Sequence, residues 1–294
     1  MRTDAGVAAL RYHGDQDRQD GQVDLAVNVR GDSPPEWLRS RLIDEIGRLG
    51  RYPDPAPAAT AVARRHGREP SEVLLTHGAA EAFVLVARAL RPRRPVVVHP
   101  QFTEPEAALR DAGCHVDRVV LAPPFDLADA SVPEDADLVV VGNPTNPTSR
   151  LHDAGPVRAL ARPGRTLVVD EAFMDAVPGE PASLSGERDV PGLVVVRSLT
   201  KQFGLAGLRA GYLLADPDTV RALQHGRPLW PVSSLALAAT QACVGPAGTA
   251  RSREIAEQTR RCRDHLLARL DRLAGVDVVE PAAASFVLLR VDDG

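Results

Sequence analysis

Short apolar runs recur along the middle of this 294-residue chain and are separated by more polar stretches. Each run is three to five residues long, rich in valine and leucine, and apolar at consecutive positions rather than at every second one. That pattern is typical of strands buried on both faces of a parallel sheet. It predicts six strands, at residues 73–75, 96–99, 138–142, 167–170, 193–197 and 211–215.

Amphipathic stretches with a helical spacing of apolar positions lie between these strands, at residues 79–90, 106–112 and 157–161. The alternation of strands and helices predicts an α/β fold with a mostly parallel central sheet and helices on both faces. Before the sheet, residues 34–49 are predicted to form a helix with Ser33 as N-cap and Pro34 as first residue.

The pattern changes after residue 227. Residues 228–274 are predicted to be helical almost throughout, and two strand-like runs follow at 276–280 and 286–291. This change predicts a second, smaller α/β domain. The predicted division is an N-terminal arm (1–27), a segment that contributes to the small domain (28–50), a large domain (51–227, entered through an extended, proline-rich linker at 51–57) and a small C-terminal domain (228–294).

Composition excludes several classes of protein. The 39 acidic and 35 basic residues are spread along the chain and give a net charge of −4, so neither nucleic acid nor an anionic membrane is an expected partner. The three cysteines have neither disulfide-framework nor zinc-site spacing, and no metal site is predicted. No segment approaches the roughly 18 to 20 apolar residues of a membrane span, so a cytoplasmic location is expected.

One basic residue stands apart. All basic residues but one are arginine, and the exception is Lys201. Arginine stays protonated in proteins, whereas a lysine amine can lose its proton and attack a carbonyl. Lys201 is therefore a candidate for covalent chemistry, the alternative being a solvated surface lysine that survived by chance.

Chemically coherent residues follow four of the predicted strands, at the edge of a parallel sheet where ligands bind. A small-residue turn that feeds a helix N-terminus, 76–81, suits a phosphate group. The second is a proline-fixed loop with Asn143 and Asn146 (142–149, GNPTNPTS), and the third is the acidic pair Asp170 and Glu171 directly after the apolar run 167–169 (170–173, DEAF). The fourth is a glycine-rich segment around the lysine (197–212, RSLTKQFGLAGLRAGY).

Together these segments resemble the fold-type I enzymes that use pyridoxal 5′-phosphate (PLP), and among them the class I/II aminotransferase superfamily. The family pattern N-P-x-N-P-T-G, then D-E-A-[YF], then S-x-[ST]-K with an arginine eight residues beyond, is matched in order along the chain. The resemblance implies that Lys201 forms a Schiff base with the cofactor. It also implies that Asp170 pairs with the pyridine nitrogen and that Asn146 binds the 3′-oxygen of the ring. From the residues alone, the less favoured alternatives are that Asp170 is a helix N-cap or a strand-end surface acid and that Asn146 is a turn residue.

The resemblance also implies the rest of the cofactor site. Ser198, Thr200 and Arg209 would bind the phosphate together with the N–H groups of Ala79 and Ala80.

Two aromatic residues complete the implied site. Phe102 would stack on the ring, although a plain core phenylalanine would look the same in the sequence. Tyr52 resembles the tyrosine that reaches the phosphate of a neighbouring subunit, which implies a homodimer with shared active sites.

The reaction is less well marked. Phe173 in D-E-A-F, where most aminotransferases carry tyrosine, and the candidate substrate contacts His13 and Asn28 resemble the branch that decarboxylates L-threonine O-3-phosphate to aminopropanol phosphate in cobalamin biosynthesis. The expected substrate is a small phosphorylated amino acid. Histidinol-phosphate aminotransferase is the alternative within the family. A PLP-binding protein with impaired catalysis is the third possibility.

Some positions depart from the family pattern. Ser149 replaces the glycine after N-P-T, and Pro105 stands where a second aromatic is expected. The family also continues beyond the point corresponding to Gly294, with an arginine that binds the substrate carboxylate, and Arg290 does not match that arginine. The resemblance therefore leads us to expect an incomplete small domain with an exposed sheet edge and weak catalysis.

Overall fold

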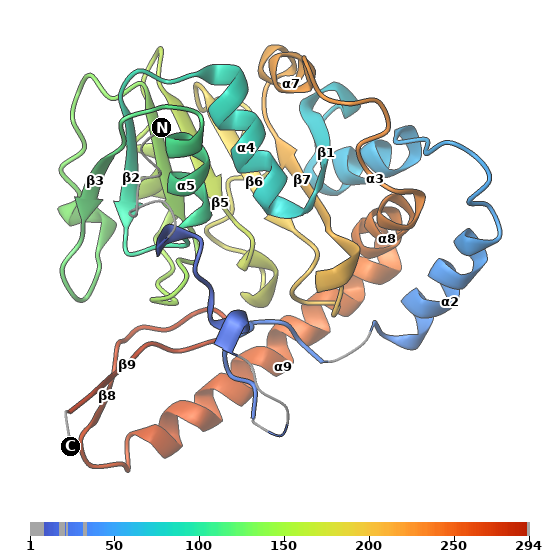
Figure 1. The fold of residues 1–294 in the computed structure, drawn as a ribbon. Coiled ribbons are helices and arrows are strands. Elements are labelled where there is room, and N and C mark those ends of the chain that lie inside the picture. The colour runs from blue at the N-terminus through green and yellow to red at the C-terminus, as the bar shows by residue number, and fades with distance from the viewer. Residues whose placement is uncertain (1–8, 18–20, 22, 32–33, 293–294) are drawn as a thin grey trace.

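The computed structural model describes residues 9–17, 21, 23–31 and 34–292. Its centre is a seven-stranded sheet in the order β1-β7-β6-β5-β4-β2-β3 (Figure 1). The strands are β1 (Val73–His77), β2 (Pro95–His99), β3 (Asp117–Val120), β4 (Leu138–Gly142), β5 (Thr166–Asp170), β6 (Leu193–Ser198) and β7 (Ala210–Leu214).

The sheet is mostly parallel, as the sequence predicts. Strands β3, β2, β4, β5 and β6 run parallel to one another, and only β7 is antiparallel to both of its neighbours, β6 and β1. All six predicted strands are present. A seventh strand, β3, was not predicted; it is an edge strand with alternating burial that ends at Val120, which is 72% exposed. The α/β prediction is confirmed.

Helices cover both faces of this sheet (Figure 1). Three of them pack on one face through a shared apolar cluster: α4 (Gly78–Leu90), α5 (Glu104–Asp111) and α7 (Pro217–Gln224). Those whose apolar residues join the cluster on the other face are α2 (Glu36–Ile46), α3 (Ala56–His66), α6 (Ala154–Arg158), α8 (Ser234–Val244) and α9 (Pro246–Leu270). Short 3₁₀ turns are η1 (Gly14–Asp17), η2 (Pro70–Glu72), η3 (Leu127–Asp129), η4 (Met174–Ala176) and η5 (Ala206–Leu208).

In every strand of this sheet except the edge strand β3, apolar side chains alternate between the two clusters. In β5, Val168 belongs to the cluster with α4, whereas Leu167 and Val169 belong to the cluster with α3 and α8. All three are fully buried, and each such side chain contributes about 1.5–3 kcal/mol of hydrophobic free energy. The alternation matters for the site, because it sends neighbouring polar residues at the strand ends to opposite faces.

Prolines move two of the predicted helix boundaries. Helix α2 begins at Glu36 with Pro35 as N-cap, so Pro34 is not its first residue. The reason is steric, because a residue that precedes a proline is driven from the helical into the extended region. The predicted N-cap, Ser33, lies outside the described residues. In the predicted linker 51–57, the non-helical part ends at Pro55, which is the N-cap of α3, and the helix begins at Ala56.

The single long helix predicted over 228–274 is wrong. The segment before residue 234 is not helical, and the rest divides into α8 and α9 at Gly245. Gly245 has an extended conformation (φ −67°, ψ 170°) because Pro246 follows it. Pro246 then takes the first position of α9, which suits it because its missing N–H would have no intrahelical partner there.

The C-terminal part forms a separate two-stranded sheet from β8 (Val276–Val278) and β9 (Leu289–Val291), both shorter than predicted. All three residues of β9 are exposed. In Figure 1 this hairpin and the far end of α9 project below the main sheet. The domain boundaries given above stay a prediction.

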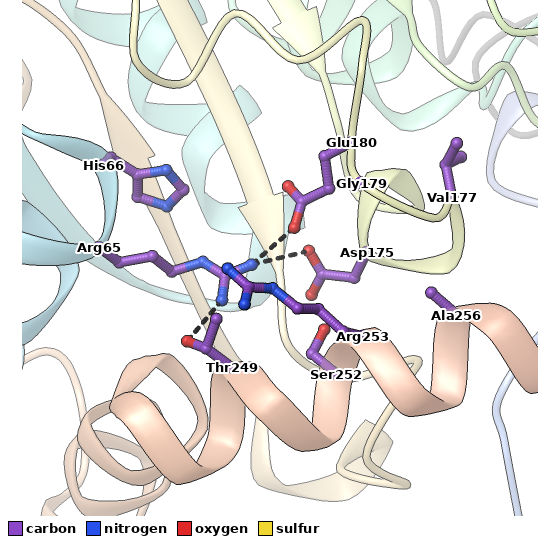
Figure 2. Close-up of a pocket in the computed structure, with 10 residues that line it drawn as sticks. All are labelled: Arg65, His66, Asp175, Val177, Gly179, Glu180, Thr249, Ser252, Arg253 and Ala256. Carbon is purple, nitrogen blue, oxygen red and sulfur yellow. Dashed lines mark hydrogen bonds and ion pairs between the residues drawn. The ribbon is translucent and has the colours of Figure 1, made fainter.

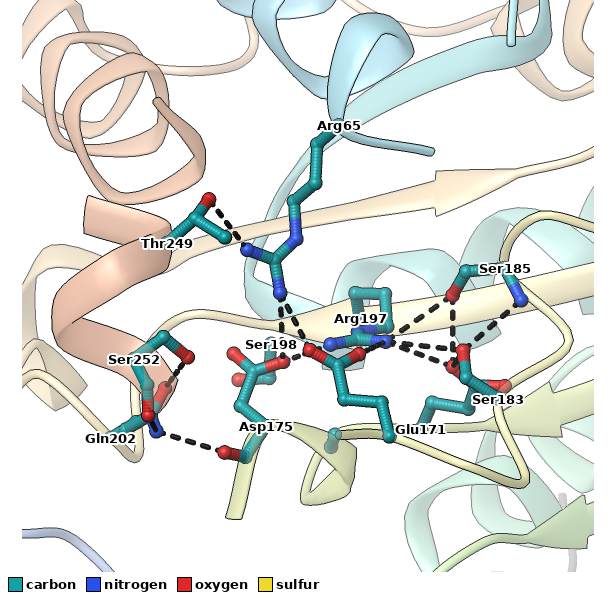
Figure 3. A network of polar contacts seen from close by, with 12 residues as sticks. Arg65, Glu171, Asp175, Ser183, Ser185, Arg197, Ser198, Gln202, Thr249 and Ser252 are labelled. Atoms are coloured by element: carbon teal, nitrogen blue, oxygen red, sulfur yellow. Dashed lines mark hydrogen bonds and ion pairs between the residues drawn. The ribbon is translucent and has the colours of Figure 1, made fainter. Parts of the chain in front are cut away.

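A buried ion network lies on the face of the sheet that α3, α8 and α9 cover (Figure 3). Its centre is Arg197 of β6, which is 1% exposed. Its guanidinium contacts Asp175, Glu171 (Nη1 to Oε2, 3.0 Å) and Glu180 (Nη1 to Oε2, 2.8 Å). Glu180 is also paired with Arg65 of α3 at 2.7 Å. These charges compensate one another, as buried charges must.

Candidate functional site

Two predicted site residues, Asp170 and Ser198, end neighbouring parallel strands. Asp170 is the last residue of β5 and lies beside Gly142, the last residue of β4, and beside Val196 of β6. Ser198 ends β6. By alternation, both side chains point to the α4 face of the sheet, opposite to the ion network.

The Asp170 carboxyl is held in a buried place. The residue is 8% exposed, and its Oδ1 accepts a hydrogen bond from the Ala172 N–H at 3.0 Å. Burial raises the pKa of Asp170 to about 6, against the opposing effects of the Ala172 N–H and the nearby Lys201 charge. An acid in this state is best satisfied by a cationic or N–H partner.

Lys201 lies in the turn that follows β6. Its Nζ is 5.6 Å from the centre of the Phe173 ring, three residues beyond Asp170. Its carbonyl accepts a hydrogen bond from the Arg30 N–H at 2.9 Å. This bond places the half-buried Asn28, two residues before Arg30, close to the lysine turn.

Two glycines let the backbone approach closely beside α4. Gly78, the first residue of α4, has φ +76°, and a Cβ there would lie 2.7 Å from Nη2 of Arg209. A Cβ on Gly211 would lie 3.0 Å from the backbone nitrogen of Ala79. The Arg209 guanidinium and the N–H groups of Ala79 and Ala80 are therefore neighbours, a donor set that suits a dianionic phosphate.

Two hydroxyl groups join this cradle. Ser198 pairs in register with Gly211, and its Oγ lies 2.7 Å from Oγ1 of Thr200. Both residues are buried. The structure thus brings all five predicted phosphate ligands to one end of the sheet.

The N-terminal arm supplies one wall. The His13 ring stacks on Phe102 with centroids 5.3 Å apart and an angle of 26° between the planes. Nε2 of His13 is 2.9 Å from Oε1 of Glu104, at the start of α5. Phe102 follows β2, so this pair lies at the same edge of the sheet as Asp170.

Asn143 and Asn146 have different surroundings. The Asn143 side chain donates to the His152 carbonyl at 3.0 Å and accepts from the His152 N–H at 2.8 Å. It therefore fixes the loop after β4. Asn146 is half-buried in that loop. The family motif thus combines one residue that holds the backbone with one that remains a candidate cofactor ligand.

Tyr52 is placed apart from this group. Its side chain is 76% exposed and stacks on Trp230, with centroids 4.1 Å apart. The predicted contact with a neighbouring subunit requires such an exposed position, and it stays a prediction.

Gln101 is a candidate site residue that was not predicted from the sequence. This residue is 5% exposed, and its Nε2 is buried without a hydrogen-bond partner among the described residues. Its Oε1 lies 3.5 Å from where a Cβ on Gly142 would stand, which places it at the end of β4. A buried donor of this kind requires an acceptor, and a bound polar group would supply one. Its only signal in the sequence is its position between a strand end and Phe102.

A small cavity of about 210 Å³ lies on the opposite face, beside the ion network (Figure 2). Arg65 crosses it to reach Glu180 and the Thr249 hydroxyl. Burial, together with the charges of Arg197 and Arg65, lowers the pKa of His66 in its wall to about 2, so this imidazole is neutral. The cavity is part of the structural network and is distinct from the Lys201 site.

Comparison with known proteins identifies the family. The family model described as aminotransferase class I and II matches residues 20–294. A histidinol-phosphate aminotransferase of Mycobacterium tuberculosis is 51% identical over 290 residues, which are 98% of this chain and 79% of the relative. This chain belongs to the class I/II aminotransferase family.

Two further relatives carry another activity in their names. A threonine-phosphate decarboxylase of Salmonella typhimurium is 33% identical over 229 residues, 74% of this chain and 63% of the relative. The structure of L-threonine-O-3-phosphate decarboxylase from Porphyromonas gingivalis superimposes with a TM-score of 0.81 at 26% identity, covering 91% of this chain and 82% of the other.

The cofactor of this aminotransferase-family enzyme is PLP. The described residues fit it in three respects: a buried acid with a raised pKa, a single lysine nearby, and a cradle of N–H, hydroxyl and guanidinium donors where two glycines leave no room for a Cβ. Among the described residues, no cluster of metal-ligating side chains and no helix long and apolar enough to cross a membrane is found.

The raised pKa of Asp170 predicts how stability depends on pH. Between its ordinary value of 3.8 and about 6, the cofactor-free native state holds a proton that the unfolded chain releases, so this group's contribution to stability is lost as the pH rises. Relative to Asp170→Asn, the free energy of unfolding should fall by about 2 kcal/mol from pH 4 to pH 7. Urea unfolding of both proteins measures the difference, and a difference independent of pH would contradict this assignment.

Proposed function

We propose that this enzyme transfers the amino group of a small phosphorylated amine, histidinol phosphate, with PLP held on Lys201. The observation that carries the proposal is the joint presence of the Lys201, Asp170 and Arg209 groups at one sheet edge in a chain that is 51% identical to a histidinol-phosphate aminotransferase. The motifs favoured decarboxylation of threonine phosphate over amino transfer from histidinol phosphate. The similarity to this relative favours amino transfer instead.

Lys201 and Asp170 would carry the chemistry. Bound PLP supplies an electron sink for the bond broken at the substrate Cα. The Asp170 carboxylate would hold a proton on the ring nitrogen, an arrangement favoured because its buried charge needs a cationic partner. Lys201 would bind the cofactor covalently and, once displaced by the substrate amine, move a proton at the Cα.

The remaining residues would bind and orient. Ser198, Thr200, Arg209 and the first turn of α4 would hold the cofactor phosphate. Phe102 would cover one face of the ring, and Asn146 would bind the 3′-oxygen.

His13 and Asn28 are the proposed substrate contacts. His13 stacks on Phe102, and Asn28 lies two residues from the backbone bond between Arg30 and Lys201. Both residues would therefore line the substrate side of the site.

Decarboxylation of threonine phosphate is the second candidate. Phe173 favours it, because an aromatic ring without a hydroxyl lies beside Lys201 where most aminotransferases carry tyrosine. The relatives from S. typhimurium and P. gingivalis support it as well. Both candidates act on a phosphorylated amine and differ in which Cα bond breaks.

Two parallel assays separate the candidates. The PLP-loaded protein is incubated with histidinol phosphate and 2-oxoglutarate, and separately with L-threonine O-3-phosphate. We expect glutamate in the first assay and no CO₂ above background in the second. Release of CO₂ without formation of glutamate would overturn the proposal in favour of the decarboxylase.

Two variants are matched controls for these assays. Lys201→Arg keeps the positive charge but has no amine nucleophile, so turnover should fall to background. Asp170→Ala should lower kcat at least about 100-fold, because it removes the partner of the ring nitrogen. Turnover that survives in Lys201→Arg would show that the measured activity does not come from this site.

We also propose that the enzyme works as a homodimer to which Tyr52 contributes across the interface. The exposed pair Tyr52 and Trp230, with Leu229 at 77% exposure, forms an apolar surface suited to an isologous contact. Light scattering of the PLP-loaded protein should give twice the chain mass of 31.4 kDa. A monomer that binds PLP tightly would contradict the shared site.

A further inference from the structure

Ser149 has an unfavourable backbone conformation. It stands where the family motif has glycine, its φ is +60°, and its side chain is fully buried. A side chain with a Cβ is disfavoured in this left-handed region, whereas glycine adopts it freely. A serine retained at such a position points to a contact made by its hydroxyl.

The hydroxyl holds a distant part of the chain. Ser149 Oγ accepts hydrogen bonds from the N–H groups of Ala283 (3.1 Å) and Ala284 (2.8 Å). The Ser149 carbonyl also accepts from the Ala283 N–H at 2.8 Å. From the other side, Arg263 of α9 donates to the carbonyls of Ala283 (2.5 Å) and Ala284 (2.9 Å). The peptide at 283–284 is thus fixed on both edges.

The fixed peptide is connected to Lys201 through two aromatic side chains. Two residues beyond Ala284, the Phe286 ring packs edge-on against Phe173, with centroids 4.9 Å apart and an angle of 79°. The Phe173 ring in turn lies 5.6 Å from Lys201 Nζ. A shift of the 283–286 segment would therefore move the aromatic pair that borders the reactive amine.

We propose that Ser149 is a positioning residue whose hydroxyl fixes segment 283–286 as a wall beside Lys201, and that this wall sets substrate affinity rather than cofactor attachment. The inference rests on Lys201 as the proposed site. Ser149 contacts the backbone N–H groups of Ala283 and Ala284, and its effect on the wall passes through them.

Two substitutions separate the hydroxyl from the backbone strain. Ser149→Gly removes the hydroxyl and relieves the strain, whereas Ser149→Ala removes the hydroxyl and keeps the strain. Both should speed amide hydrogen exchange in a peptide covering residues 279–288, roughly three- to tenfold, since a buried acceptor is lost. Both should also raise the KM for the phosphorylated amine several-fold with little change in kcat. Ser149→Gly should have a higher thermal midpoint than Ser149→Ala, because only the glycine also relieves the backbone strain.

A third readout needs no substrate. Hydroxylamine removes lysine-bound PLP at a rate that depends on how easily it reaches the bond between Lys201 and the cofactor. That rate should rise in both variants. The visible absorbance of the untreated holoenzyme should stay unchanged. If the proposed amine is not a substrate, the KM comparison fails, yet hydrogen exchange and hydroxylamine access still test the wall. The two failures are therefore distinguishable.

Thr148→Val is the matched control. Thr148 is equally buried in the same loop, but its hydroxyl accepts only the local Arg150 N–H at 3.2 Å among the contacts described. It should leave exchange in residues 279–288 unchanged. The proposal is overturned if Ser149→Gly behaves as the native protein while Ser149→Ala does not, or if Thr148→Val loosens the segment as much as Ser149→Ala.

Discussion

The charge of Arg197 is the constraint on which this end of the sheet depends. A guanidinium cannot lose its proton inside a protein, so its burial at 1% exposure requires carboxylates brought to it. They come from the segment after β5, which supplies Glu171, Asp175 and Glu180. These ion pairs consequently hold the ends of β5 and β6 together on the face of the sheet that α3, α8 and α9 cover.

The ion pairs of Arg197 also position candidate site residues on the opposite, α4 face of the sheet. Asp170 precedes Glu171, and Ser198 follows Arg197. Each of these two candidate site residues is therefore next in the chain to a member of the ion network, and its side chain points to the opposite face of the sheet. Lys201 is followed by Gln202, whose amide donates to the carbonyls of Asp175 (2.8 Å) and Ser252 (2.9 Å). The lysine and its acid are thus adjacent to residues whose side chains are held by buried hydrogen bonds and ion pairs, the kind of support that precise sites require.

The sequence allowed the core of this arrangement to be predicted, because buried parallel strands are continuous apolar runs and strand-end residues converge at one edge. The sole lysine and three ordered motifs located the cradle of Ser198, Thr200 and Arg209. Edge strand β3 was not predicted because one of its faces is solvated, so it lacks a continuous apolar run. The break at Gly245 was not predicted because the helical spacing on both sides outweighed one Gly-Pro pair. Gln101 and the contact between Ser149 and Ala284 depend on burial and on residues 135 positions apart, which no local pattern encodes.

Borohydride reduction of the PLP-loaded protein followed by peptide mapping tests the central claim most directly. Reduction makes the bond between cofactor and lysine permanent, so the labelled peptide reports which amine carries PLP. The account predicts a single labelled peptide, modified at Lys201, and no labelling of Lys201→Arg. Label recovered at the N-terminal amine, or PLP bound tightly without any covalent label, would contradict it.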